Sequence, residues 1–171
     1  GDLYEKYTLK WTVSTSCGSV EDVVDITFGQ DTTGTPVSDI EGNSYETVWI
    51  GSQNWMAENL KTTTYNDGKP ITLEPDNGDW SNLTTEAYCW YDNDSATYAD
   101  TYGALYNFYA VNTGNLCPDG WHVPTQIDWT DLTNYLGALG YTDMEGAALK
   151  AKSGWNSSGN GSDDFDFTAL P

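Results

Sequence analysis

The sequence predicts a loop-rich α+β fold, and three observations lead to that fold class. Short runs in which apolar and polar residues alternate, such as 7–13, are typical of strands. One longer segment, residues 126–136, carries its apolar residues at helical spacing. Turn-forming residues are abundant between these segments, with 17 glycines in 171 residues. We therefore expect short strands and helices joined by long loops.

The first 30 residues form a unit of their own, which is a predicted β-hairpin. Apolar and polar residues alternate from 7 to 13, and residues 23–28 supply a second apolar strand. Two strands alone are only marginally stable in water. Residues 31–36 are polar and predict a linker, so that the main domain covers residues 37–171.

The main domain begins with short strands separated by turns and ends with a brief helix and one more strand. Residues 102–111 are dense in alanine, leucine and aromatic residues and fit either a short helix or a turn-rich part of the core. Strands are predicted at 37–40, 45–50, 53–57, 88–91 and 165–170, and the brief helix at 144–152.

Residues 117–136 form the unit around which the rest of the domain is organised. A tight turn and a short extended piece, residues 121–123, lead to Thr125. Thr125 is a predicted helix N-cap, and Asp128 three residues later completes an acidic version of the capping box.

The apolar residues of this unit predict one buried cluster. Trp129, Leu132 and Leu136 recur at helical spacing, and the preceding turn brings Trp121 to the same place. Gly137 is the expected end of the helix. We therefore expect Trp121, Trp129, Leu132 and Leu136 to be buried together.

Composition excludes two classes of partner. The chain has 26 acidic and 6 basic residues, a net charge of −20 that repels the phosphate backbone of a nucleic acid. No run of about 18 apolar residues is present, so no membrane span is expected. The acidity fits either calcium binding or solubility in a secreted or salty setting.

Two acidic loops are candidate Ca²⁺ sites, because calcium prefers clustered oxygen ligands. The first contains Asp92, Asn93 and Asp94, and the second contains Asp163 and Asp164. Neither matches an EF-hand, and solvated acidic turns are the alternative interpretation. Calcium is the one cofactor that the sequence suggests.

Catalytic machinery is sparse, and the chain is not expected to be an enzyme. His122 is the single histidine, and a structural role is expected for it. Cys17, Cys89 and Cys117 have no CxxC spacing and cannot complete a zinc site with one histidine. Their odd number predicts a free thiol or a missing partner.

Exposed aromatic residues on loops predict a glycan-binding surface instead. Tryptophan and tyrosine rings stack on sugar rings, while Asn and Asp bind hydroxyl groups. The candidates on or beside loops are Trp80, Trp90, Tyr91 and Tyr98. Most of the 8 tryptophans are nevertheless expected in the core.

Three blocks of sequence carry a family resemblance. They are DIEGNSYETVWIGSQNWMAENLKTTTYNDG, YGALYNFYAVNTGNLC and LCPDGWHVPTQIDWTDLTNYLG, in that order. Over about residues 37–171 the chain resembles the Fibrobacter succinogenes major paralogous domain. The resemblance implies a C-type-lectin-like fold, which is distantly similar to the formylglycine-generating, sulfatase-modifying enzymes. Their C-terminal cysteine pair has no match here, so their activity is not expected.

The resemblance also implies further polypeptide. Typical members continue past a segment like FTALP to a strand whose cysteine would pair with Cys117, whereas this sequence stops at Pro171. We therefore expect an incomplete domain with an apolar face exposed near Phe165 and Phe167. Residues 1–30 resemble the closing hairpin of an immunoglobulin-like repeat of bacterial surface adhesins, and both ends are expected to contact further polypeptide or neighbouring subunits.

Two short segments resemble O-glycan acceptor sites of exported proteins of Bacteroidota. They are Asp94-Ser95-Ala96 and Asp31-Thr32-Thr33, in which Ser95 and Thr32 would be modified. Unmodified polar loops are the alternative.

The function expected from all of this is binding at the bacterial cell surface. The module would bind a glycan or a surface protein, outside the cell, as part of a large surface protein. One alternative is a carbohydrate-targeting module of a secreted polysaccharide-degrading system. The other is a structural subunit of a surface filament.

Overall fold

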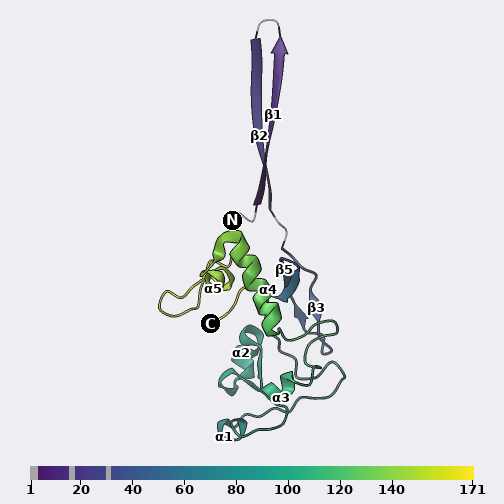
Figure 1. Cartoon of the computed structure of the whole chain (residues 1–171). Helices are drawn as coiled ribbons and strands as arrows, with labels where there is room; N and C mark the ends of the chain where they lie inside the picture. The colour runs from purple at the N-terminus through teal and green to yellow at the C-terminus, as the bar shows by residue number, and fades with distance from the viewer. Residues whose placement is uncertain (1–3, 16–17, 30–31) are drawn as a thin grey trace.

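The chain combines a long N-terminal hairpin with a loop-rich domain of short helices and small sheets (Figure 1), which confirms the α+β fold class. The computed structural model describes residues 4–15, 18–29 and 32–171. The elements in chain order are β1 (Tyr4–Thr15), β2 (Gly18–Gly29), β3 (Val37–Ser38), β4 (Ser44–Tyr45), β5 (Thr47–Ile50), β6 (Gln53–Met56), α1 (Asn77–Trp80), β7 (Tyr88–Trp90), the 3₁₀ turn η1 (Tyr91–Asn93), α2 (Ser95–Tyr102), β8 (Ala104–Tyr106), α3 (Phe108–Val111), α4 (Gln126–Leu136), the π-helical turn η2 (Gly137–Tyr141) and α5 (Glu145–Leu149).

The sheets of the described ranges are all two-stranded and antiparallel: β1–β2, β3–β4, β5–β6 and β7–β8. In the N-terminal hairpin the register runs from Tyr4 opposite Gly29 to Thr15 opposite Gly18. This hairpin projects away from the rest of the chain (Figure 1). No helix of the described ranges is long and apolar enough to cross a membrane.

Two of the predicted extended segments are irregular in the structure. Residues 165–170 do not form a strand, because Asp166 and Thr168 have positive φ angles of 53° and 54°, which break an extended run. Only one β-bridge, between Lys150 and Ala169, remains there. Residues 121–123 are also irregular, although the turn before them is closed by a hydrogen bond from Trp121 N to Pro118 O at 3.0 Å.

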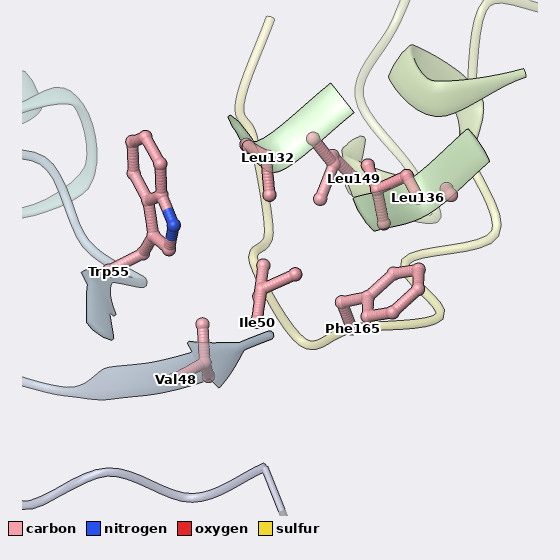
Figure 2. Close-up of a cluster of buried hydrophobic side chains, with 8 residues drawn as sticks. Val48, Ile50, Trp55, Leu132, Leu136, Leu149 and Phe165 are labelled. Atoms are coloured by element: carbon pink, nitrogen blue, oxygen red, sulfur yellow. The ribbon is translucent and has the colours of Figure 1, made fainter. Parts of the chain in front are cut away.

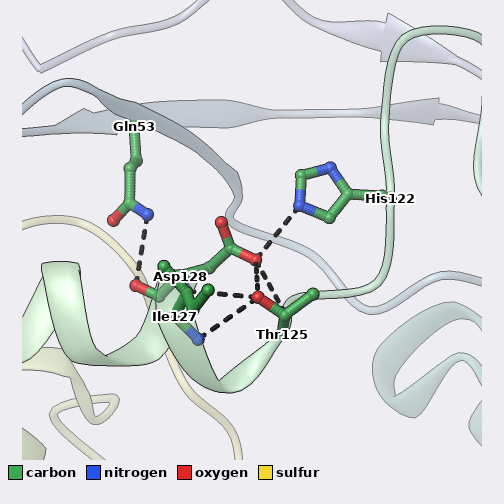
Figure 3. A network of polar contacts seen from close by, with 5 residues as sticks. All are labelled: Gln53, His122, Thr125, Ile127 and Asp128. Carbon is green, nitrogen blue, oxygen red and sulfur yellow. Dashed lines mark hydrogen bonds and ion pairs between the residues drawn. The ribbon is translucent and has the colours of Figure 1, made fainter.

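Helix α4 has the predicted bounds and the predicted N-terminal cap. The Thr125 hydroxyl accepts from the backbone N–H groups of Ile127 and Asp128, and Asp128 Oδ2 accepts from Thr125 N at 2.7 Å (Figure 3). Hydrogen bonds from the Thr125 hydroxyl, the Thr125 backbone and His122 lower the pKa of Asp128 to about 2. The Gln53 amide donates to the Asp128 carbonyl oxygen at 3.1 Å and so links β6 to α4. His122 Nε2 lies 3.1 Å from Asp128 Oδ2, and the structural role of this histidine stays a prediction.

The first hydrophobic core lies between the β5–β6 sheet, α4, α5 and the C-terminal segment. Figure 2 shows side chains from the sheet meeting those of the helices and the C-terminal segment across this core. Its buried members are Val48, Ile50, Trp55, Leu132, Leu136, Ala148, Leu149 and Phe165. The predicted burial of Leu132 and Leu136 is confirmed.

The predicted burial of the two tryptophans is wrong. Trp129 is 43% exposed, although its spacing of three residues from Leu132 places it on the side of α4 that carries the buried leucines. The Trp129 ring lies at the edge of the core, with its centroid 4.9 Å from that of Trp55, so one side is covered and the other faces solvent. Trp121 is half-buried and belongs to neither core.

The expectation of an exposed apolar face near the C-terminal end is also wrong. Phe165 is 1% exposed, and its ring meets the Tyr141 ring edge-on at 5.4 Å. Phe167 is half-buried and packs against Trp55 at 5.8 Å. Both rings therefore contribute to the first core.

A second core lies between the β7–β8 sheet, α3 and the long connecting loops. Segment 102–111, for which the sequence left a short helix or a turn-rich part of the core, contains β8 and α3 and contributes to this core. Its buried members are Tyr65, Ile71, Tyr88, Ala110 and Leu116.

A buried carboxylate fixes the turn between β3 and β4. Asp39 accepts hydrogen bonds from the backbone of Glu41 at 2.9 Å, from the backbone and side chain of Asn43 at 2.9 and 2.8 Å, and from the Tyr45 hydroxyl at 2.7 Å. Burial alone raises the pKa of Asp39. The hydrogen bonds outweigh burial and hold that pKa below its ordinary value of 3.8.

The stabilisation from Asp39 should therefore depend on pH. A carboxyl group whose folded-state pKa is depressed stabilises the fold above its unfolded-state pKa, and this contribution is lost as the pH falls through the folded-state pKa. The difference in free energy of unfolding between the native chain and Asp39→Asn should be constant above about pH 5 and shrink below about pH 4. Urea titrations across this range measure it, with Asp79→Asn, an exposed carboxylate on α1, as the control. A difference that does not change with pH would contradict the role of Asp39.

Candidate binding surface

The region after β7 positions the aromatic residues that the sequence singled out. The chain turns sharply in η1, where Asp92 and Asn93 adopt positive φ angles of 50° and 54°. Asp and Asn tolerate this backbone conformation better than other side chains do. The Asn93 amide donates to Pro75 O at 2.7 Å, and Asp94 accepts from Thr97 N at 3.1 Å as the N-cap of α2. The turn and the start of the helix are thus held by polar side chains.

Three tyrosines meet on the outside of this turn and helix. Tyr98 and Tyr102 lie four residues apart on α2, which places them on one face of the helix. The Tyr91 centroid lies 5.0 Å from that of Tyr98 and 5.6 Å from that of Tyr102, and the last two are 5.9 Å apart. Tyr91 is 48% exposed and the others are half-buried. We call this group the tyrosine surface.

These rings do not serve either hydrophobic core. Helix α2 has no buried residue, and none of its residues belongs to a core cluster. The helix is held by polar contacts instead: Asn59 Nδ2 donates to Tyr102 O at 3.0 Å, and Lys61 Nζ lies 3.1 Å from Asp100 Oδ1. Gly103, directly after α2, lets the backbone pass close to Leu60, because a Cβ at position 103 would lie 2.4 Å from Leu60 O. The exposed aromatic area is therefore available to a ligand.

The structure brings together only part of the predicted ligand-binding set. Tyr91 and Tyr98 are in direct ring contact. Trp90 is half-buried and packs on Tyr88 at 5.5 Å as part of the second core, and Trp80 ends helix α1 outside this ring cluster. Tyr102 was missed, although its spacing of four residues from Tyr98 is a signal that the sequence contains.

The predicted calcium ligands are distributed among other roles. Asp94 caps α2, Asp163 accepts from Thr168 N and Oγ1 at 2.8 and 3.1 Å, and Asp164 accepts from the Ser162 hydroxyl at 2.8 Å. Across the described ranges, no three His, Cys, Asp or Glu side chains are grouped so that they could hold a metal ion. Calcium binding therefore stays a prediction without support from this geometry.

The predicted modification sites and thiols also have defined places. Ser95 is exposed and is the first residue of α2 instead of a loop residue. Thr32 is half-buried, and its carbonyl oxygen accepts from Trp49 N at 2.7 Å. Cys89 and Cys117 are free thiols, and burial raises the pKa of both. Cys17 lies outside the described residues.

A shallow pocket of about 450 Å³ lies beside the β5–β6 sheet. It offers hydroxyl and carboxylate groups but no aromatic ring on which a sugar could stack. Moreover, one of its carboxylates, Glu58, already accepts from Glu46 N at 2.7 Å. Its lining residues are Thr32, Thr33, Glu46, Thr47, Val48, Ala57, Glu58, Asp166 and Thr168. The tyrosine surface is the better candidate for a ligand that presents a ring.

Comparison with known proteins gives a family for most of the chain. No curated protein and no solved structure matches the sequence. The model of the Fibrobacter succinogenes major domain matches residues 48–171, a range that contains the tyrosine surface, helix α4 and both cores. The chain therefore belongs to the Fibrobacter succinogenes major domain family.

Proposed function

We propose that this chain is a non-catalytic binding module that attaches a bacterial surface protein to a glycan outside the cell. The observation that carries the proposal is the tyrosine surface, in which three rings contact one another, Tyr91 is exposed and the other two are half-buried. A tyrosine has an apolar ring for stacking and a hydroxyl group for hydrogen bonding, which suits it to a partly polar sugar.

The surroundings of the rings support a sugar as the ligand. Asp92 and Asn93 follow Tyr91 directly and are exposed, so that polar groups stand beside the stacking surface. A glycan needs this combination, because its ring faces are apolar and its edges carry hydroxyl groups. The tyrosine contacts also fix the rings before binding, which reduces the loss of side-chain entropy when a ligand docks.

The proposed fold and setting are a C-type-lectin-like domain preceded by the end of an immunoglobulin-like repeat. Supporting features of the domain are its small antiparallel sheets, its long loops and one well-capped helix packed on the β5–β6 sheet. The long β1–β2 hairpin supports the repeat, and the acidic composition suits a secreted protein. The non-catalytic role is supported by His122, which takes part in the cap of α4.

Replacing one ring should test the proposal. Tyr91→Ala should weaken glycan binding about 3- to 10-fold, as expected when an aromatic contact of about 0.5–1.5 kcal/mol is lost. The measurement is a titration of the full chain with a panel of soluble polysaccharides, followed by affinity electrophoresis or calorimetry. Repeating the titration with EDTA shows whether a divalent cation contributes.

The matched control is Trp49→Ala on β5. Trp49 is 46% exposed, close to the 48% of Tyr91, but it lies on the β5–β6 sheet, whereas Tyr91 lies in η1. Trp49→Ala should leave binding unchanged. If no polysaccharide binds the native chain, or if the two variants lose affinity equally, the tyrosine surface is not a glycan site.

A further inference from the structure

We propose that the tyrosine surface selects sugars that carry free, positively charged amino groups over neutral and acidic sugars. This inference rests on the proposed function, because it names the class of glycan that the same surface takes. It follows from the charges around the rings and from the way in which the rings pack.

The chain lacks the residues that recognise acidic sugars. Carboxylate and sulfate groups are best bound by arginine, which offers paired donors, and this sequence contains no arginine. No lysine occurs between Lys69 and Lys150, a range that includes all three tyrosines. Lys61, which contacts α2, already pairs with Asp100 at 3.1 Å. With a net charge of −20, the chain repels a polyanion.

The same surroundings are complementary to a cation. The carboxylate of Asp92 is exposed one residue after Tyr91 and makes no hydrogen bond or ion pair with the described part of the chain. The faces of aromatic rings attract ammonium groups. An amine on a sugar that stacks on Tyr91 is therefore expected to gain from the aromatic ring and from the acidic surroundings, in which Asp92 is the next residue along the chain.

The ring packing decides which kind of cation fits. The three centroids are 5.0 to 5.9 Å apart, so the rings contact one another and leave no space for a cation between them. The surface is thus not a cage for a quaternary ammonium group. Because the Tyr91 ring is inclined by 83° to that of Tyr98 and by 44° to that of Tyr102, and is the most exposed of the three, it is the ring on which one amino sugar would stack.

Three oligosaccharides of one length and one β-1,4-linked glucose backbone test the selection. They carry a free amine, an N-acetyl group or a hydroxyl group at carbon 2, and the full chain is titrated in weakly acidic buffer, in which the amines are protonated. The amine form should bind about 3- to 10-fold more tightly than the other two, as expected from one exposed cation–π contact and one exposed ion pair. High salt should reduce this advantage, because it screens exposed charges.

Two variants separate charge from stacking. Asp92→Asn should reduce the advantage of the amine form while the neutral forms bind as before. Tyr91→Ala should weaken all three. Asp131→Asn, which removes an exposed carboxylate from α4, is the matched control and should retain the full preference.

The outcomes distinguish this inference from the proposed function. Equal binding of the three oligosaccharides overturns the selection for amines but leaves glycan binding intact. If the chain binds none of the three oligosaccharides and no other polysaccharide, both the selection for amines and the proposed glycan binding are wrong. If polylysine binds more tightly than the amine form, the ligand is a basic polypeptide, and the assignment to amino sugars is wrong.

Discussion

Leu132→Ala should lower the free energy of unfolding by about 2–5 kcal/mol, the cost of a cavity in a well-packed core. Leu132 is 0% exposed and lies on α4 facing the β5–β6 sheet, α5 and the C-terminal segment. Truncation removes its methyl groups from all of these contacts at once. The measurement is chemical denaturation of the full chain, followed by tryptophan fluorescence.

The control for Leu132 is on the same helix. Ile127 is 72% exposed, so Ile127→Ala should change the free energy of unfolding by no more than about 0.5 kcal/mol. Both variants replace a branched aliphatic residue by the best helix former, so helix propensity cannot account for the difference. Similar losses for the two variants would show that α4 does not use Leu132 to dock onto the sheet.

The local features of α4 could be read from the sequence because they depend on neighbours in the chain. The bonds between Thr125 and Asp128 span three residues, and the spacing of Leu132 and Leu136 is that of one helix face. These features were predicted correctly. The burial of Trp129 was not, because it depends on where the Trp55 ring lies, on a strand some seventy residues earlier.

The candidate binding surface shows the same difference between local features, which the sequence predicts, and features that depend on distant residues, which it does not. Tyr91 and Tyr98 were predicted because they stand beside polar loops, and Tyr102 could have been added from helical spacing alone. Trp90 directly precedes Tyr91 in the sequence, but it ends strand β7 and packs against the second core. A pattern of alternating residues does not say which side of a two-stranded sheet is covered. That depends on contacts between segments distant in the sequence, such as the pairing of Trp90 with Ala104 across the β7–β8 sheet.

Backbone conformation was the least predictable feature. The segment 165–170 alternates in hydrophobicity as a strand does, yet Asp163, Asp166 and Thr168 all have positive φ angles. Thr168 is held there by two hydrogen bonds to Asp163. A β-branched residue avoids this conformation unless its surroundings impose it, so the sequence pattern alone favours a strand.

Phe165→Ala should be the most destabilising single change, with a loss of about 3–5 kcal/mol as for a large aromatic residue in a core. Phe165 is 1% exposed and packs against Tyr141, beside the side chains of Leu136 and Leu149 (Figure 2). It also attaches the irregular C-terminal segment to the first core, beside the backbone hydrogen bonds that join this segment to α5, such as Asp164 N to Ala148 O at 2.8 Å. Phe108→Ala, at a ring that is 71% exposed on α3, should cost less than about 1 kcal/mol. Both values come from the same denaturation experiment. If Phe165→Ala unfolds at the denaturant concentration of the native chain, the C-terminal segment is not part of the cooperative core.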